Sequence, residues 1–430
     1  MRDKVIKGKR SPWAWIPTLY IAEGLPYFAV NTLTVLMYTN LGVSKTDMAF
    51  FTGWLYLPWV IKPFWSPFVD LMRTKRWWIL AMQLLIALTM TGVAFALPGS
   101  LFFSATLAIF WVMAFASATH DISADGFYML ALDERRQAAY VGVRSTFYRI
   151  ASILGQGGIV MLAGYLETSL GNIPRAWSLT FGLLSAFFLL VFVYHIYALP
   201  HPKADRPTPG VTASNILSDF LMTFRTFFSK PGILAALAFM LLYRLPEALC
   251  IKMIQPFMKD GMADGGLGMS TSEIGFVNGT VGVIALLAGG VLGGVLIAKG
   301  GLRKWLFPMA AALTLPCGVY CYLASAQPEN LTLISVLIGF EQFGYGFGFT
   351  SFMLYLMYFS RGESSTSHYA FCTAFMALGM MIPGMAAGWL FEQMAFLDST
   401  SPYAPFFWLI MAVSVVTFAV TGLVRKQIKE

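Results

Sequence analysis

Charge is scarce in this sequence. Asp, Glu, Lys and Arg make up 12% of the 430 residues, about half the share that a soluble domain carries. So few charges cannot solvate the whole surface of a chain of this length, which excludes an ordinary water-soluble domain. Hydrophobic residues account for 57% of the chain, and the mean hydropathy is +0.68. The chain must therefore present apolar side chains to lipid.

Cysteine and histidine are also rare, with four residues of each. No cluster of Cys and His has the spacing of a metal site. The glycines between Gly344 and Gly348 do not follow a strand, so they are not a nucleotide-binding fingerprint. We therefore expect no metal ion, no cofactor and no enzymatic activity. The cysteines, all inside apolar runs, are Cys250, Cys317, Cys321 and Cys372.

Long continuous apolar runs are what the sequence has in abundance. A helix that crosses a bilayer needs about 20 mostly apolar residues, and twelve runs qualify. We expect an all-α polytopic membrane protein, because the runs do not alternate as the strands of a membrane barrel do. The first run is too long for a signal peptide and lacks a small-residue cleavage site, so we interpret it as a retained span. The predicted spans are 13–39, 47–69, 77–97, 101–131, 138–165, 175–198, 231–258, 272–298, 304–324, 331–358, 368–395 and 403–424.

The Lys and Arg residues are unevenly distributed over the loops between these runs. With the N-terminus in the cytoplasm, 21 of the 29 fall on the inside, and only Lys45, Arg175 and Lys259 fall in outside loops. Cytoplasmic loops carry such an excess. We therefore expect a multi-pass inner-membrane protein with both termini in the cytoplasm. The formal charge of +8 then faces the anionic membrane surface, and we expect no nucleic-acid partner.

One polar stretch, 199–230, interrupts the apolar runs. Four prolines at its start prevent a helix from continuing, and residues 215–228 then have the pattern of an amphipathic helix at a membrane surface. The stretch predicts a division into an N-terminal six-helix half (1–198), a cytoplasmic linker (199–230) and a C-terminal six-helix half (231–430).

The cation-rich turns after the second and the eighth predicted spans resemble each other, which favours two pseudo-symmetric halves. The first turn contains Asp70 and Arg73. Two interpretations of this pair stay open: a gating loop pinned by the charge pair, or cations that only set the topology.

Ten ionisable residues lie inside the predicted spans, where an unpaired charge is costly. Acids and bases are equal in number, which suggests mutual pairing around a polar cavity. A purely structural bundle does not need them, so they are the strongest functional signal in the sequence. They are Glu23, Asp121, Asp125, Glu247 and Glu341, and Lys62, Arg144, Arg149, Arg244 and Lys252.

Asp121 and Asp125 are four residues apart and share a helix face. Two carboxylates this close in a low dielectric are not easily both ionised unless cations intervene. Three interpretations stay open: one of them carries a proton, both are held in static salt bridges, or they contact the solute. Glu23, Glu247 and Glu341 are the other proton-coupling candidates.

The basic residues within spans are candidates for binding a solute. Arg144 and Arg149 lie about 140° apart on their helix, so one is expected to pair with the preceding carboxylates and the other to face the cavity. Arginine binds a carboxylate or phosphate through two parallel hydrogen bonds, which favours an anionic solute. Lys62 either reaches the cytoplasmic interface or contacts the solute.

The seventh predicted span is expected to kink at Pro246, with Arg244 and Glu247 pairing across the kink. Polar residues on this and other spans complete the predicted substrate site. These further candidates are Asn31, Tyr148, Gln156, Lys252 and Gln342.

Two motifs resemble the AmpG-type muropeptide permeases of the major facilitator superfamily. They run from Lys62 to Asp70 and from Ser117 to Asp125, and the stretches 24–26 and 275–282 fit the same family. The related acetyl-CoA transporter group shares parts of them. The resemblance implies the major facilitator fold and a proton-driven importer, in the bacterial inner membrane, of anhydro-muropeptides recycled from the cell wall. It gives functional weight to Lys62, Asp121 and Asp125.

We therefore expect a secondary transporter, a proton-coupled importer of anhydro-muropeptides or related sugar-peptides. The alternative is a carrier of another polar or anionic solute, such as a sugar, a peptide or an acyl-CoA-like compound. We expect a monomer whose partners are the solute, protons and the lipid bilayer. A membrane-embedded transferase is the rival from another class, but no nucleophile–base arrangement and no large extramembrane loop stands out.

Overall fold

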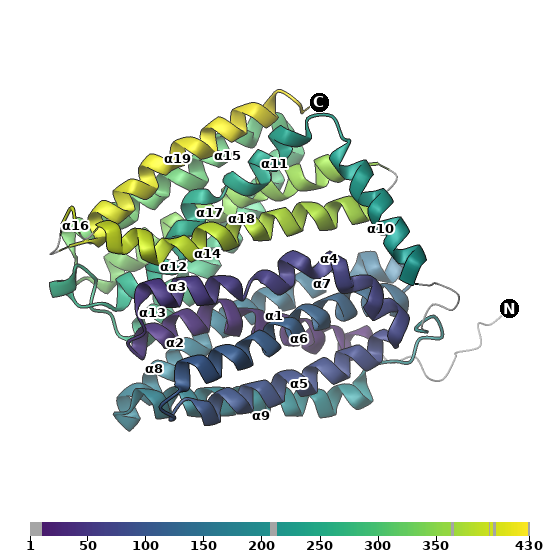
Figure 1. Ribbon diagram of the computed structural model, residues 1–430, viewed down its shortest axis with the longest axis horizontal. Coiled ribbons are helices and arrows are strands. Elements are labelled where there is room, and N and C mark those ends of the chain that lie inside the picture. The colour runs from purple at the N-terminus through teal and green to yellow at the C-terminus, as the bar shows by residue number, and fades with distance from the viewer. Residues whose placement is uncertain (1–10, 207–212, 363–364, 395, 399–400, 429–430) are drawn as a thin grey trace.

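The computed structural model of the protein describes residues 11–206, 213–362, 365–394, 396–398 and 401–428. Within these residues every regular element is a helix. Figure 1 shows one bundle in which α1 to α9 form one group of long helices and α11 to α19 form another. The fold class expected from the apolar runs is confirmed.

The first group contains six predicted spans, two of them built from pieces that are not all α-helical. A π-helical segment, Ala29–Leu33, joins α1 to α2, and another, Leu154–Gly158, joins α7 to α8. The helices are α1 (Ile16–Phe28), α2 (Thr34–Asn40), α3 (Lys45–Trp54), α4 (Leu57–Met72), α5 (Lys75–Ala96), α6 (Phe102–Ala131), α7 (Glu134–Ile153), α8 (Ile159–Leu170) and α9 (Ile173–Ala198).

The second group follows α10 (Ala213–Phe228), the helix expected in the linker. A π-helical segment, Gly275–Gly282, joins α13 to α14, and a 3-10 turn, Leu315–Cys317, joins α15 to α16. The helices are α11 (Ile233–Leu242), α12 (Leu245–Lys259), α13 (Thr271–Ile274), α14 (Val283–Gly300), α15 (Leu302–Thr314), α16 (Gly318–Ala326), α17 (Leu331–Ser360), α18 (Ser365–Met394) and α19 (Tyr403–Arg425).

Ten helical stretches of the described chain are long and apolar enough to cross a membrane. They coincide with predicted spans three to twelve. The first two predicted spans form the helical stretches 16–40 and 45–72, and the second of these breaks at Leu55 and Tyr56. Pro58 is the second residue of α4. Proline is tolerated in the first turn of a helix but has no N–H to donate to a preceding turn, so the helix restarts there.

Both groups of helices come together at one end of the bundle. Helix α10 and the C-terminal end of α19 lie at the opposite end (Figure 1). We call the end without them the distal end; it carries the α2–α3, α8–α9 and α12–α13 connections.

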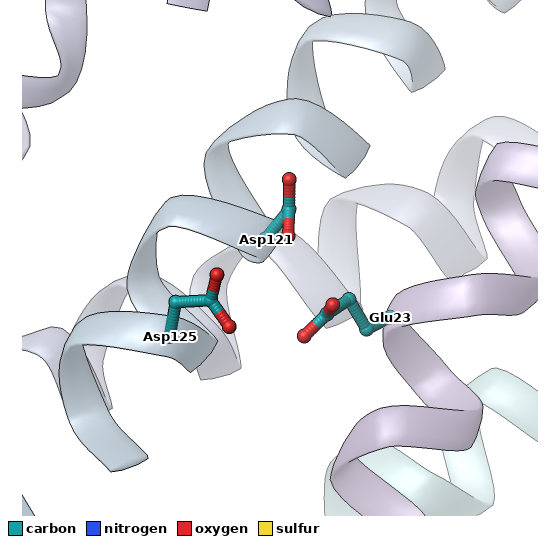
Figure 2. Close-up of side chains that lie close together, drawn as sticks. All are labelled: Glu23, Asp121 and Asp125. Carbon is teal, nitrogen blue, oxygen red and sulfur yellow. The ribbon is translucent and has the colours of Figure 1, made fainter. Parts of the chain in front are cut away.

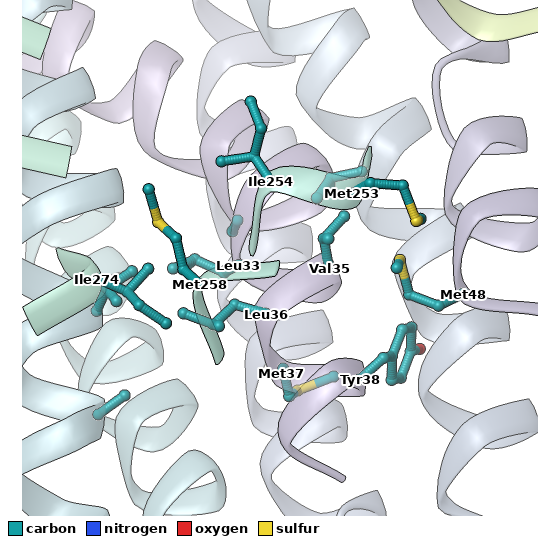
Figure 3. Close-up of a cluster of buried hydrophobic side chains, with 14 of the residues drawn as sticks. Leu33, Val35, Leu36, Met37, Tyr38, Met48, Met253, Ile254, Met258 and Ile274 are labelled. Carbon is teal, nitrogen blue, oxygen red and sulfur yellow. The ribbon is translucent and has the colours of Figure 1, made fainter. Parts of the chain in front are cut away.

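The groups pack through apolar side chains and glycines in the distal part of the bundle. Val35 and Leu36 belong to one buried cluster with Ile254 and Met258 of α12 (Figure 3). Helix backbones also approach closely, since a Cβ atom on Gly279 would lie 1.9 Å from the carbonyl oxygen of Gln156. Dense packing of this kind closes the distal part of the bundle to a solute.

The linker contacts both groups of helices. Both carboxylate oxygens of Asp205 accept hydrogen bonds from the start of α5, from Lys75 N at 2.6 Å and Arg76 N at 3.0 Å. Asp205 therefore caps the N-terminus of α5, although it lies 130 residues later in the sequence. On the other side, the rings of Phe224 and Phe371 join α10 to α18, with centroids 5.9 Å apart.

Candidate functional site

A cavity of about 1090 Å³ lies between the two groups of helices. Its lining begins at Val35, near the start of α2, and at Ile254 of α12, and it reaches the ends of α6 and α18 that lie away from the distal end. We call it the central cavity. Its polar lining residues include Asn31, Lys62, Asp121, Asp125, Gln156, Arg244, Glu247, Gln255, Asn278, Glu341 and Gln342.

Three carboxyl groups gather on the wall of the first group of helices. Asp121 and Asp125 project from α6 toward Glu23 of α1 (Figure 2). One oxygen from each residue lies within 4.8 Å of the others. We call these three residues the acidic cluster. A second cavity of about 660 Å³ adjoins it and is lined by Glu23 and Asp121.

Two basic residues neutralise part of the acidic cluster. Lys62 Nζ donates a hydrogen bond to Asp121 Oδ2. Arg144 Nη2 lies 2.5 Å from Asp125 Oδ1, and its guanidinium stacks over the ring of Tyr20. Each aspartate therefore has a cationic partner in this structure, one of them Lys62 of α4, and the three interpretations of the aspartates stay predictions. Neither alternative for Lys62 anticipated this pair.

Glu23 has no such partner. Its side chain is 6% exposed, its Oε2 atom accepts no hydrogen bond, and no cation of the described chain lies within ion-pair distance. With all three carboxyls ionised, the acidic cluster and its two cations would hold one uncompensated negative charge. A proton on Glu23 removes that charge at low cost, because a buried carboxylic acid is far easier to accommodate than a buried carboxylate.

The second group of helices contributes one ion pair to the central cavity. Helix α11 ends at Leu242, and α12 begins at Leu245 with Pro246 in its first turn. Arg244 lies in the break between the two helices. Arg244 donates to both oxygens of Glu247, at 2.8 and 2.6 Å, and to the hydroxyl of Tyr345 at 2.8 Å. The pairing across a kink that the sequence predicts is confirmed.

The remaining charged candidates of this group have neutral partners. Glu341 is buried and accepts hydrogen bonds from Tyr320 at 3.1 Å and Gln342 at 2.8 Å. Lys252 is buried and donates to Thr52 Oγ1 of α3 at 3.0 Å, across the boundary between the groups of helices. Its ammonium also lies 5.4 Å from the ring centroid of Tyr56.

Arg149 is exposed, and no carboxylate of the described chain pairs with it. Its neighbours Tyr148 and Ser152 line the central cavity, but Arg149 itself is not among the residues that line either cavity. The expected pairing of one arginine with the preceding carboxylates is therefore found for Arg144, and the expected cavity-facing position of the other stays a prediction.

The gating-loop pair stays a prediction. The side chain of Asp70 lies outside the described residues, and the guanidinium of Arg73 stacks 5.8 Å from the ring centroid of Trp77.

Aromatic rings are the part of the site that the sequence analysis missed. Tyr27 and Trp59 meet edge to face at 5.2 Å in the wall of the central cavity, and Tyr148 and Tyr345 line it as well. Tyr148 alone was a candidate. Aromatic residues in apolar runs are normally packing or lipid contacts, so no local signal distinguishes the rings that face the cavity from the others.

The family is decided by a sequence comparison. A family model described as "Major Facilitator Superfamily" matches residues 18–248, which is more than half of the chain. The chain belongs to the major facilitator superfamily. It is therefore a secondary transporter, and the transferase rival is set aside.

Two relatives within the superfamily carry names that agree with the AmpG resemblance. The anhydromuropeptide permease of Escherichia coli strain K12 is 26% identical over 382 residues, covering 87% of this chain and 73% of that protein. The putative transporter AmpG 4 of Rickettsia conorii is 24% identical over 390 residues, covering 87% of this chain and 89% of that protein.

Solved structures of the superfamily share the fold. The nucleoside transporter NupG superposes with a TM-score of 0.71 at 14% identity, over 95% of this chain and 98% of that one. A D-xylose–proton symporter gives 0.71 at 12% identity, over 96% of each chain. At these identities the likeness establishes the architecture and says nothing of the cargo.

Proposed function

We propose that the protein is a proton-coupled importer of anhydro-muropeptides or related cell-wall sugar-peptides. One observation supports this more than any other: of the ten charged residues in the spans, three acid–base pairs form, and two acids and two bases are left without an ionic partner. The acids, Glu23 and Glu341, are suited to carry protons. The bases, Arg149 and Lys252, are suited to bind a carboxylate.

The lining of the central cavity suits a solute that is part sugar and part peptide. Aromatic faces such as those of Tyr27 and Trp59 stack on sugar rings, and the amides of Gln156 and Gln342 match peptide groups. Lys62 and Arg244 of the same lining have the donors that a carboxylate needs. The name of the E. coli relative supports the same cargo class. Another polar or anionic solute remains the alternative, and direct competition separates the two.

The transport cycle follows from the two six-helix halves, 1–198 and 231–430, joined by the linker 199–230. The Lys and Arg bias favours a cytoplasmic position for the open end of the central cavity. Solute and proton enter from the distal side, the halves rock, and both are released inside. The protein acts as a monomer in the inner membrane, and no metal ion takes part, because Lys62 and Arg144 already contact two carboxylates of the acidic cluster.

Uptake by the pure protein in liposomes tests this function. Accumulation of an anhydro-muropeptide should depend on an inward proton gradient and collapse when a protonophore is added. Asp121→Asn should insert normally and lose accumulation, because Lys62 is left without its anionic partner. Uptake that ignores the protonophore, or an Asp121→Asn variant with full activity, contradicts the proposal.

Arg149 and Lys252 have no ionic partner among the described residues, and neither lines the central cavity in this structure, so we expect them to bind the anionic part of the solute in another state of the transport cycle. We expect Arg149→Gln and Lys252→Gln each to raise the KM for uptake by roughly 10- to 100-fold, the loss expected for a charge-assisted hydrogen bond. Arg175→Gln is the matched control, since Arg175 is exposed in the first turn of α9 at the distal end. For a solute analogue without carboxyl groups, the KM should be the same in both variants as in the parent. An equal rise in KM for that analogue would mean that the two bases are needed for folding.

A further inference from the structure

Two of the three cations in the predicted outside loops lie on the boundary between the halves. Lys45, at the start of α3, places Nζ 2.7 Å from Asp260 Oδ2, just after α12. The same ammonium lies 5.2 Å from the ring centroid of Phe391 and 5.7 Å from that of Tyr403. Tyr403 in turn donates to Asp260 at 2.8 Å. A lysine of the N-terminal half is thus held by an anionic, aromatic pocket of the C-terminal half.

The second contact has the opposite polarity. Glu167 of α8 accepts a 2.5 Å hydrogen bond from Thr271 Oγ1 of α13, and Lys259 Nζ lies 4.0 Å from Glu167 and 3.2 Å from that hydroxyl. Asn40 donates to both Glu167 and Thr271, at 2.6 and 2.8 Å. Here the N-terminal half supplies the anion and the C-terminal half supplies the cation.

Close packing of helix backbones lies beside both of these contacts. A Cβ atom on Gly388 would lie 2.2 Å from the carbonyl oxygen of Lys45, and one on Gly164 would lie 2.4 Å from the amide nitrogen of Ser272. Each charged contact therefore sits beside a place where helices of opposite halves touch through glycine. The halves cannot separate at the distal end without breaking both contacts.

We infer that the pairs Lys45–Asp260 and Lys259–Glu167 form a latch, which holds the distal end closed in the state described here. The latch consists of two ion pairs between the halves with opposite polarity. The latch must open before a solute can enter the central cavity from the distal side. This inference rests on the proposed transport cycle, which requires such an opening. Because the two pairs have opposite polarity, each half carries one cation and one anion, and only one alignment of the halves satisfies both pairs.

The latch is tested by thiol labelling, which needs neither a solute nor a proton gradient. Thr32 lines the central cavity and serves as the reporter after Thr32→Cys, with the four native cysteines replaced by alanine. A membrane-impermeant maleimide added to the distal face should label this cysteine slowly in the parent. Lys45→Asp, Asp260→Lys and Glu167→Lys should each speed labelling about 5- to 30-fold.

The exchange variants decide between a latch and general packing. Lys45→Asp with Asp260→Lys, and Glu167→Lys with Lys259→Glu, should return labelling toward the parental rate, since each restores an ion pair with reversed polarity. Arg175→Asp controls for loss of positive charge at the same face, and labelling from the other face confirms folding. Where a reversal prevents insertion, the neutral variants Asp260→Asn and Lys259→Gln give the decision.

Unchanged labelling in the single variants, or exchange variants that label as fast as the singles, would overturn the latch. If the parent protein labels as described but does not take up a muropeptide, the proposed cargo is contradicted and the latch is not.

Discussion

Glu23→Gln should abolish proton-driven accumulation while leaving exchange of solute across the membrane intact. Glutamine is nearly isosteric with a protonated glutamic acid, so the variant resembles the protonated state permanently. With the outside two pH units more acidic, coupling to one proton sustains up to about 100-fold accumulation, because each pH unit is worth about 1.36 kcal/mol. The variant should reach only about 1-fold. Accumulation and counterflow, measured on the same liposomes, separate coupling from transport.

Glu341→Gln is the matched comparison for this result. Both glutamates are buried and lack a cationic partner, but Glu341 is hydrogen-bonded to Tyr320 and Gln342, and Glu23 lies in the acidic cluster with an unpartnered oxygen. We expect Glu341→Gln to keep most of the accumulation. If the Glu23→Gln variant accumulates solute as well as the parent does, Glu23 takes no part in coupling. If only Glu341→Gln loses coupling, the coupling proton binds at Glu341 in the C-terminal half.

The sequence predicted local relations well, because they depend on helical periodicity and composition. The twelve apolar stretches, the linker helix α10 and the Arg244–Glu247 pair across the break before Pro246 all belong to this class. Each is encoded within a few residues, where the pattern of apolar runs and proline decides the backbone.

Relations between distant spans were not predictable in the same way. Nothing in the spacing of Lys62 indicates that Asp121, 59 positions later, is its partner, and nothing near Glu23 places it beside α6. Lys45 and Lys259 illustrate the same limit: the positive-inside count treats them as exceptions in outside loops, and the fold uses them to join the halves. Tertiary packing alone determines such pairs.

The Arg244–Glu247 pair provides the second large effect, on stability. Both side chains are nearly buried, 11% and 13% exposed, so removing one partner leaves an uncompensated charge. Arg244→Leu and Glu247→Leu should each destabilise the protein by about 3–5 kcal/mol. The double variant should recover most of that loss, because leucines of similar volume need no counter-ion. Apparent Tm values in one detergent, with Arg175→Leu as a surface control, measure all four.

Transport distinguishes why the pair is present. Arg244 and Glu247 both line the central cavity, and the same arginine donates a hydrogen bond to the hydroxyl of Tyr345 and lies over its ring. We expect the double variant to be stable and inactive, since a neutral wall can no longer exchange Glu247 for a solute carboxylate on the arginine. If the double variant is as unstable as either single variant, the pair is a structural element of the α11–α12 break. If it is stable and transports normally, the solute does not use this wall of the cavity.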